Sequence, residues 1–488
     1  MAITITQTPS LPFDMAYGPN PITLSGIDTI DPIPDKYALR IFLLGNPIPI
    51  ADIRQTPNRV GVAIFDAQNV LQSYIGPSKY DIDGLFAGSF VAASRPLHIA
   101  DGELIEYQIS FNYELAGGTL GPTWTTPSTV YTTIAGSKQY NEVPFDADYY
   151  RPQVNGSGAG GCTVITKYGK ALSDNKWTIT EQQTGDEFLQ EGYTSPGGII
   201  VQDVYLGDQM TKTFYSPIER TQGTTDPLAQ GLESFDIIQF SGEFFIANST
   251  LNNTRSNGGG PNTAPGQGLL VGGAYQTITI ACGPDNLPIP LNPQTTHYYV
   301  IPKVYDDCAS SAEAAWQAQR FNVKHDVLSA PGESLVIAQK AKECNDYPHI
   351  QFAWLNSLGF RDQFTFTKRN EKKINTKRNE FLKEAADYNS TEYSVDLLSR
   401  GYTTYSQTIK ETWEATSGYM NNEQAELLES MFKSAQVNVK FSDGEYAEEW
   451  QPVRLQSSSY TQKTVRKDQL FQYKVIFTFA NNIKSQRG

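Results

Sequence analysis

One stretch, HIQFAWLNSLGFRDQFTFT at residues 349–367, constrains the fold more than any other. Large apolar side chains recur at every second position on both sides of an Asn-Ser-Leu-Gly interruption. This pattern predicts two β-strands joined by a tight turn that contains Gly359, with aromatic side chains along one face. The expected structural hairpin comprises Phe352, Trp354, Leu355, Asn356, Gly359, Phe364 and Phe366. None of them is an acid, a base or a nucleophile, so the feature is architectural rather than chemical.

The length and composition indicate several mainly β domains. A chain of 488 residues is too long to fold around a single hydrophobic core, so its length predicts roughly two to four domains. Aromatic residues make up 12% of the chain, which also has 39 Gly and 28 Pro. Aromatic residues favour strands, and Gly and Pro favour turns. We therefore expect a mainly β protein of antiparallel sandwiches, followed by a C-terminal α+β domain.

Residues 1–136 are expected to form a β-sandwich domain. Apolar runs of strand length occupy residues 37–44 and 60–66. Residues 104–115 alternate most clearly, with Tyr107 and Ile109 on one face and Gln108 and Ser110 on the other, which predicts a half-buried strand. A Gly/Pro/Thr-rich loop is expected at 119–127.

Residues 137–345 are expected to form a β-rich domain with long Gly-rich loops, or an insertion into a sandwich; one domain and two both fit. The loops lie at 155–161 and 257–268. Neither ends in the GK[ST] of a phosphate-binding P-loop. The spacing of Ser310 and Glu313 matches a capping box, which predicts a short helix over 312–320.

Residues 346–488 are expected to form an α+β domain with one helix packed on an antiparallel sheet. The helix should begin at Asn421, because Ala425, Leu428 and Phe432 share a face at the helical period. The last strand, at 470–479, places an aromatic or apolar residue at every second position. Before the helix, the charged segment 368–383 contains KRNE twice, nine residues apart.

Charge is distributed unevenly along the chain. The formal net charge is −14, but residues 361–488 hold 19 basic and 17 acidic side chains, which leaves 19 basic and 35 acidic among residues 1–360. Because residues 1–360 are strongly acidic and would repel phosphate, we do not expect nucleic-acid binding over the whole surface. The basic segment is either a solvated hairpin tip, a site for DNA or an acidic partner, or a contact with the acidic front of a neighbouring copy, which we favour. The candidate subunit contact is Lys368, Arg369, Lys372, Lys373, Lys377 and Arg378.

No cofactor or metal is expected from the cysteines or histidines. The four cysteines lie 26 or more residues apart without a CxxC pair, which gives structural zinc no support. The N-terminus lacks the pattern of a signal peptide, so we expect synthesis in a reducing cytoplasm. No apolar run reaches 18 residues, so no membrane span is expected. The histidines form no HxH or HExxH motif and are expected to be structural; they are His98, His297, His325 and His349.

Other residues allow weaker hypotheses about chemistry. Asp81-Ile-Asp-Gly84 resembles the start of a calcium loop, but its twelfth position is Ala92 rather than Glu. A glycan hydrolase would need a carboxylate pair, for which the candidates are Asp146, Asp148, Asp306 and Asp307. A glycan-binding attachment module would need exposed aromatic side chains, for which the candidates are Trp124, Tyr149, Tyr150 and Trp177. Packing under loops also explains such aromatic residues, and we favour packing.

The hairpin also carries a resemblance to a known group of proteins. FAWLNSLG at residues 352–359, followed by an aromatic strand, resembles the WLN-x-LG hairpin of virion proteins in tailed phages of Bacteroidota hosts, the crAss-like phages included. The closing LFQYKVIFTFANN at 470–482 is similar to their C-terminal strand. The resemblance covers roughly the last 140 residues. It implies a non-enzymatic structural component of the tail, baseplate or neck. Such a protein is made in the host cytoplasm and assembles into the virion with copies of itself, in a ring or similar homo-oligomer, and with other virion proteins.

Overall fold

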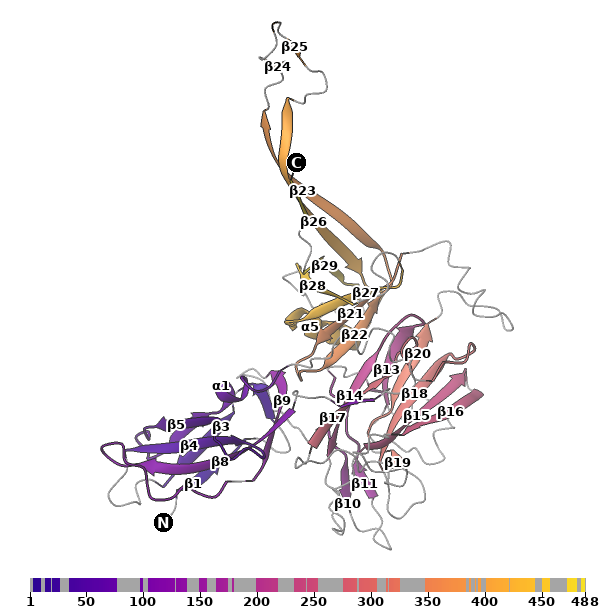
Figure 1. Cartoon of the computed structure of the whole chain (residues 1–488). Coiled ribbons are helices and arrows are strands. Elements are labelled where there is room, and N and C mark those ends of the chain that lie inside the picture. The colour runs from indigo at the N-terminus through magenta and orange to yellow at the C-terminus, as the bar shows by residue number, and fades with distance from the viewer. Residues whose placement is uncertain are drawn as a thin grey trace. The chain divides into compact units, whose positions relative to one another are not determined.

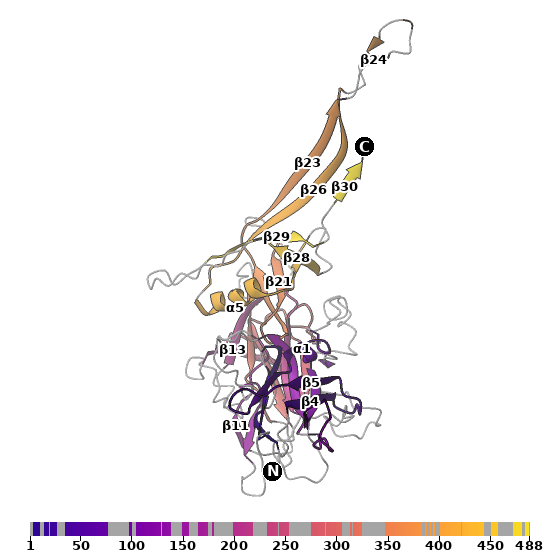
Figure 2. The same ribbon diagram turned by 90° about the vertical axis from the view of Figure 1, so that its left-hand side faces the viewer.

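The structure of the whole chain is a computed structural model, shown from two directions in Figures 1 and 2. The residues that it describes are 3–9, 14–18, 20–26, 35–76, 97–99, 104–127, 129–137, 149–155, 164–173, 178–179, 199–217, 232–242, 244–252, 275–287, 289–304, 313–314, 316–324, 347–382, 386–387, 391, 394–395, 401–420, 422–443, 450–456, 472–480 and 484–487. These residues form mainly β-strands, most of them antiparallel, with helices α1 (Gln68–Leu71) and α5 (Asn422–Lys433). The predicted fold class is confirmed.

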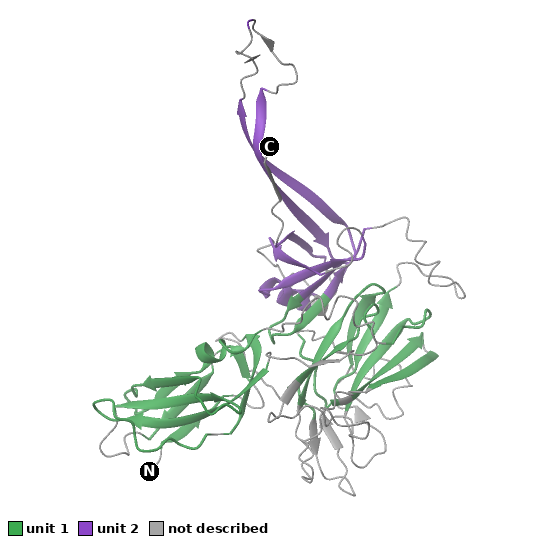
Figure 3. Ribbon diagram, viewed as in Figure 1, with its two compact units in different colours: residues 1–345, 354–363 green, residues 346–353, 364–488 purple. Residues whose placement is uncertain are grey.

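The chain divides into two compact units, coloured separately in Figure 3. Unit 1 contains residues 1–345 and 354–363, and unit 2 contains residues 346–353 and 364–488. The predicted hairpin is therefore divided between them. Its turn and the adjoining strand ends belong to unit 1, whereas the outer ends of both strands belong to unit 2.

The first part of unit 1 is built from two sheets around one core. The five-stranded sheet has the order β2 (Asp14–Tyr17), β9 (Tyr131–Ser137), β8 (Leu104–Glu114), β4 (Lys36–Leu43) and β5 (Ala51–Gln55). The three-stranded sheet has the order β1 (Thr4–Gln7), β3 (Pro21–Ser25) and β6 (Ala63–Asp66). Leu24 and Phe65 of the second sheet share a buried cluster with Leu39 and Ile109 of the first. This arrangement is a sandwich, in which alternate side chains of each strand enter the core.

Strand β8 differs from its prediction on the face away from this core. Ser110 and Asn112, expected to face solvent, are buried together with the core-facing Tyr107 and Ile109. The loop after β8 covers them: the Ser110 hydroxyl donates to the Thr125 carbonyl at 2.5 Å, and the Asn112 amide donates to the carbonyl of residue 121 at 3.0 Å. Local alternation gave the strand correctly but could not predict that a later loop covers its polar face.

The remainder of unit 1 has a seven-stranded and a three-stranded sheet. The first contains β12 (Thr178–Ile179), β13 (Ile199–Tyr205), β20 (Gln319–Lys324), β18 (His297–Val304), β15 (Leu232–Ser241) and β16 (Phe244–Asn252), with β19 (Glu313–Ala314) beside β18. The second contains β14 (Thr211–Pro217), β17 (Tyr275–Ala281) and β7 (Leu97–Ile99). A separate pair is β10 (Gln153–Asn155) and β11 (Val164–Lys167). Phe214 packs against Phe235 and Trp316, with ring centroids 5.7 and 6.5 Å apart, so both sheets share a core.

The helix predicted over 312–320 is wrong. The described residues there form β19 and the start of β20, which pairs parallel with β13 and antiparallel with β18. Phe321 and Val323 of β20 and the preceding Trp316 are buried in the core. Pairing with two distant strands and burial of these side chains outweigh a local capping pattern, because most of the stability of such an element comes from tertiary packing.

An eight-stranded sheet runs through the C-terminal part of the chain. Its order is β22 (Arg361–Phe366), β21 (Ile350–Leu355), β27 (Val437–Phe441), β28 (Gln451–Leu455), β29 (Lys474–Phe479), β26 (Tyr402–Thr416) and β23 (Asn370–Leu382), with β30 (Lys484–Arg487) also paired with β26. A short separate pair is β24 (Ala386–Asp387) and β25 (Ser394–Val395). The hairpin predicted from the sequence is present as β21 and β22.

Aromatic contacts and one helix form the core of unit 2. The Phe352 ring lies 4.7 Å from Phe366 and 5.5 Å from Phe477, measured between centroids. Ring pairs of this kind stabilise beyond the area that they bury. The predicted helix is confirmed as α5, Asn422–Lys433; its predicted first residue, Asn421, lies outside the described residues. It buries Ala425, Leu427, Leu428 and Met431.

Candidate functional site

The hairpin turn is organised by the side chain of Asn356. Its Oδ1 accepts hydrogen bonds from the backbone N–H groups of Leu358 and Phe360, both at 3.0 Å. Its own backbone N–H donates to the Phe360 carbonyl at 2.7 Å, and its carbonyl accepts from the Gly359 N–H at 3.1 Å. Asn side chains commonly replace a backbone acceptor in this way. Gly359 has φ +87°, a conformation that glycine adopts without steric cost.

This turn is buried within unit 1. A Cβ placed on Gly359 would lie 2.4 Å from the Ala135 carbonyl oxygen, and the Ser137 N–H donates to the Ser357 carbonyl at 2.7 Å. Leu358 and Phe360 belong to an apolar cluster with Met15, Ile134, Leu172 and Tyr215. The turn therefore brings together residues from β2, β9 and β14, and leaves no room for a side chain at position 359.

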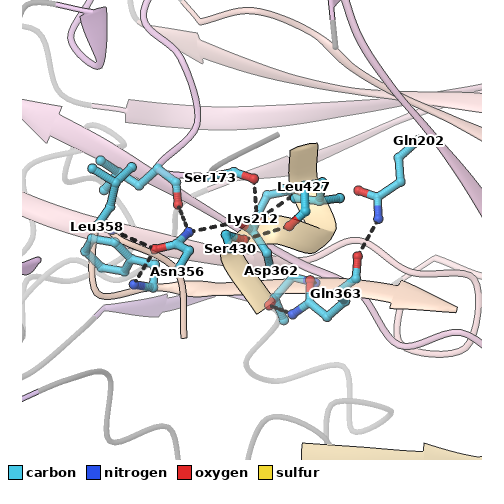
Figure 4. Close-up of polar contacts among 12 residues, drawn as sticks. Ser173, Gln202, Lys212, Asn356, Leu358, Asp362, Gln363, Leu427 and Ser430 are labelled. Atoms are coloured by element: carbon cyan, nitrogen blue, oxygen red, sulfur yellow. Dashed lines mark hydrogen bonds and ion pairs between the residues drawn. The ribbon is translucent and has the colours of Figure 1, made fainter. Parts of the chain in front are cut away.

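A polar cluster, which comprises Lys212, Asp362, Ser173 and Asn356, lies beside the turn (Figure 4). The Lys212 Nζ is 3.9 Å from Asp362 Oδ1, and the exposed fractions of the two side chains are only 3% and 1%. The Ser173 hydroxyl donates to the same oxygen, and Asn356 Nδ2 donates to Asp362 Oδ2 at 3.0 Å. The carboxylate therefore has both a cation and two hydrogen-bond donors, as a buried charge requires.

The next residue, Gln363, extends these contacts. Its Nε2 donates to the Thr211 hydroxyl at 2.6 Å, and its carbonyl accepts from Gln202 Nε2 at 2.8 Å (Figure 4). Gln363 is fully buried and belongs to unit 1. Its two contacts join the start of β22 to β14 and β13 of the same unit. Buried polar groups that are paired in this way favour one packing arrangement, because a shift would leave the paired donors and acceptors without partners.

The chemistry available to the polar cluster is structural. Proton transfer to a substrate requires a group within hydrogen-bond reach of it. Lys212 and Asp362 are directed at one another inside the protein, and their hydrogen-bond partners belong to the same chain. The arrangement can hold the turn in place and can reject alternative registers of β22.

Sequence reasoning missed most of this cluster. Asn356 and Gly359 were predicted as hairpin residues, but Lys212, Ser173 and Asp362 were not. One signal was available: Arg361, Asp362 and Gln363 are three successive polar residues in an otherwise aromatic strand, which a buried strand tolerates only with partners. The identity of those partners, Lys212 above all, is not encoded locally.

The other predicted hairpin residues fall on both sides of the unit boundary. Trp354 is fully buried in unit 1, and Leu355 beside it is partly exposed. Phe352, Phe364 and Phe366 belong to unit 2, where Phe364 and Phe366 lie 5.9 Å apart between ring centroids. The apolar alternation therefore serves two cores rather than one.

The candidate subunit contact lies on a ribbon formed by β23 and β26, and β26 pairs on its other edge with β29 at 413–416 and with β30 at 406–409. Figure 2 shows the two strands side by side, and their pairing continues from Asn370 opposite Ala415 to Leu382 opposite Tyr402. At about 3.3 Å per residue, the thirteen residues of β23 span roughly 40 Å. Every residue of β23 after Asn370 is exposed. The basic segment is thus mostly a strand, and not the tip of a hairpin.

The six predicted contact residues have different surroundings. Lys372 pairs with Glu411 at 3.1 Å, and Arg378 Nε donates to Gln407 Oε1 at 3.4 Å. Arg369 pairs with Glu371. Among the described residues, no ion-pair partner is found for the remaining three, which are Lys368, Lys373 and Lys377.

The ribbon also exposes large apolar side chains. Ile374 at its middle has an exposed fraction of 57%, and the others are Phe381, Leu382, Tyr402 and Tyr405. Exposed apolar residues that gather on one element mark interaction surfaces more often than scattered ones do. The ribbon therefore combines cations, apolar side chains and an extended backbone.

The remaining sequence candidates do not converge on a second site among the described residues. The His297 ring stacks on Phe240 at 5.1 Å between centroids, and His98 lies in β7. Trp124 is covered by the Arg40 guanidinium at 3.9 Å, and Tyr149 is half exposed. Outside the described residues lie His325, Trp177, Asp81, Gly84, Ala92, Asp146, Asp148, Asp306, Asp307 and the glycine loops at 156–161 and 257–268.

Metal-binding clusters and membrane-spanning helices are absent from the described part of the chain. No group of three or more His, Cys, Asp or Glu side chains there is placed to hold a metal ion. No helix there is long and apolar enough to cross a membrane.

Comparisons with known proteins leave the family open. No protein-family model matches the chain, and no curated protein matches it. One solved structure to which it is similar is native Escherichia coli alpha-2-macroglobulin, at 6% identity and a TM-score of 0.18. That alignment covers 97% of this chain, which spans only 20% of the alpha-2-macroglobulin chain. A similarity this weak carries no argument about fold or function.

Proposed function

We propose that this chain is a non-enzymatic structural subunit of a tailed-phage virion, in the tail, baseplate or neck, that acts by assembling with copies of itself and with other virion proteins. The observation that supports assembly most directly is the exposed ribbon of β23 and β26. β29 and β30 pair with parts of β26, but no described strand pairs with the outer edge of β23, whose residues after Asn370 are all exposed. An exposed edge strand of this length gains stability when a neighbouring subunit covers it.

Charge supports the same proposal. Six cations lie among residues 368–382 against two carboxylates, whereas residues 1–360 are strongly acidic. The faces of the ribbon are therefore suited to an acidic surface of a neighbour, the head-to-tail contact expected from the sequence. The likeness of residues 352–359 and 470–482 to phage virion proteins supplies the virion as the setting.

The experiment compares the full chain with a variant whose ribbon is shortened. Lys372 and Trp413 face one another directly, so an Asn-Gly turn can replace residues 373–412 and keep the pairing of 370–372 with 413–415; the change also removes residues 406–409, with which β30 pairs. The purified full chain is expected to form rings or other regular oligomers by electron microscopy and mass photometry, and the shortened chain to remain monomeric. Raising salt from about 0.05 to 1 M should weaken the head-to-tail contact, because exposed charges are screened. A full chain that stays monomeric with the other particle components present would refute the proposal.

A further inference from the structure

Among the strands that the structure describes, none pairs with the outer edge of β23. β23 is the last strand in its sheet: one edge pairs with β26, and no described strand pairs with the other. β23 is also regular, because the extra residue at the bulge in the ribbon is Tyr405 of β26. Such an edge presents a row of N–H and C=O groups to which another extended strand can add.

The sequence of this edge is complementary to itself. Lys-Arg-Asn-Glu occurs at 368–371 and again at 377–380. When one copy of the motif lies antiparallel to another, Lys faces Glu, Arg faces Asn, Asn faces Arg and Glu faces Lys. Opposite charges directly across an antiparallel pair stabilise it, and like charges destabilise it.

We propose that β23 pairs antiparallel with β23 of a second copy of this chain, across a twofold axis that passes between the two Ile374 residues. In this register a residue that precedes Ile374 by some number of positions faces, in the second copy, the residue that follows Ile374 by the same number. Within β23, Glu371 then faces Lys377 of the second copy; where the pairing continues two residues before the strand, Lys368 faces Glu380. The twofold axis repeats both pairs, so both motifs of each chain are matched.

The register is specific because of where the charges lie. A twofold axis perpendicular to a sheet passes through a pair of directly opposed, identical residues. Centring the axis on any other residue from 368 to 380 either opposes like charges or provides a single type of opposite-charge pair, whereas the Ile374 register adds a second type through Lys368, two residues before β23. Centring on Ile374 opposes no like charges and joins two side chains that are each 57% exposed in the single chain.

Lysine on an edge strand ordinarily prevents such pairing, because two lysine-bearing edges repel one another. Here the repeat places a carboxylate or a neutral residue opposite every cation between 368 and 380. The inference rests on the proposed assembly function and names the first contact within it: the ribbon edge joins two copies, whereas its faces stay available to other neighbours.

Disulfide trapping of the full chain tests the register. Ile374→Cys places two thiols directly opposite, where strand Cβ atoms lie about 4.5–5.5 Å apart, close to disulfide geometry. Thr376→Cys is the matched control: it is the next residue on the same exposed face, but the two thiols would lie about 14 Å apart along the strands. Mild oxidation should produce a covalent dimer of the Ile374→Cys chain and none of the Thr376→Cys or unsubstituted chain, on a gel without reductant.

Charge reversal tests the pairing independently. Glu371→Lys and Lys377→Glu should each raise the dimer dissociation constant about tenfold in sedimentation experiments, and the double variant should restore it. Weakening of the ribbon itself would not produce this result. Within the chain Glu371 faces Glu414 and Lys377 faces Thr408, so neither single change introduces a like-charge pair across the ribbon.

The outcomes separate this inference from the proposed function. Larger assemblies in which the Ile374→Cys thiols stay unlinked, or link no faster than the Thr376→Cys thiols, would refute the register and leave the assembly function standing. A twofold dimer that never joins a particle would support the register and refute the virion function. A chain that is monomeric at every concentration and with every component would refute both.

Discussion

The Lys212 ammonium and the Asp362 carboxylate form a buried ion pair, 3.9 Å apart, between β14 and the second strand of the hairpin. Ser173 and Asn356 complete the hydrogen bonding of the carboxylate. A pair of this kind contributes less to net stability than to specificity, because desolvation of both charges offsets much of their attraction. The pair therefore serves mainly to fix the position of the hairpin turn within unit 1.

Removing one member of this pair should be costly. Lys212→Met leaves the Asp362 charge buried without its cation, which costs about 3–5 kcal/mol. Lys212→Met combined with Asp362→Asn should cost less than the sum of the two single changes by more than about 1 kcal/mol, because the residues are coupled. Urea unfolding of the four proteins measures the coupling. Strictly additive losses would mean that the two charges do not interact.

Gly359 should tolerate no side chain. Gly359→Ala combines positive φ, which costs about 1–3 kcal/mol in a non-glycine residue, with a Cβ 2.4 Å from the Ala135 carbonyl oxygen. Gly117→Ala is the matched control, because Gly117 has φ +94° and no atom within 4 Å of the added Cβ. We expect a clearly larger drop in melting temperature for Gly359→Ala, and insoluble protein for Gly359→Val. Equal drops would show that the close approach to Ala135 is absent.

Trp354 should behave as a core residue. Trp354→Ala removes a fully buried ring and should cost about 3–5 kcal/mol. Tyr419→Ala is the control, since Tyr419 has an exposed fraction of 68% and surface substitutions usually stay within about 0.5 kcal/mol. Thermal unfolding distinguishes the two variants. A soluble Trp354→Ala protein with a near-parental melting temperature would contradict the burial of this ring.

Acid should weaken the N-terminal sandwich through Glu114. Its carboxylate accepts a hydrogen bond from Lys36 at 3.1 Å and another from Arg54. Both contacts lower the pKa of Glu114, and the hydrogen bond from Lys36 has the largest effect. A lowered folded-state pKa gives stability that is present above the unfolded value of about 4.3 and is lost as pH falls through the folded value.

The Glu114→Gln variant should therefore be less stable than the parent at pH 7, and the difference should shrink as pH is lowered below about 4. Lys36→Met provides the control, because removing the main hydrogen-bond donor should reproduce part of the same pH-dependent difference. Melting temperatures measured from pH 7 downward give both curves. A difference that is independent of pH would show that the carboxylate charge does not contribute.

Much of the C-terminal fold could be predicted because its signals are local. Alternating aromatic residues gave β21 and β22, the Asn356 to Gly359 turn followed from turn chemistry, and the helical period gave α5. Each depends on neighbours a few positions away, where strand and helix geometry determine which side chains share a face. The charged segment at 370–382 carried no such apolar signal, and its strand state comes from pairing with β26.

The sequence by itself determined that this chain is mainly β, where the hairpin turns, and that its cations concentrate in one segment. Only the tertiary structure decided that β20 is a strand, that a loop covers Ser110, and that Asp362 meets Lys212. These outcomes depend on which distant segments come together, and the free energy of that choice is shared among many contacts across the chain. Local patterns contain no record of it.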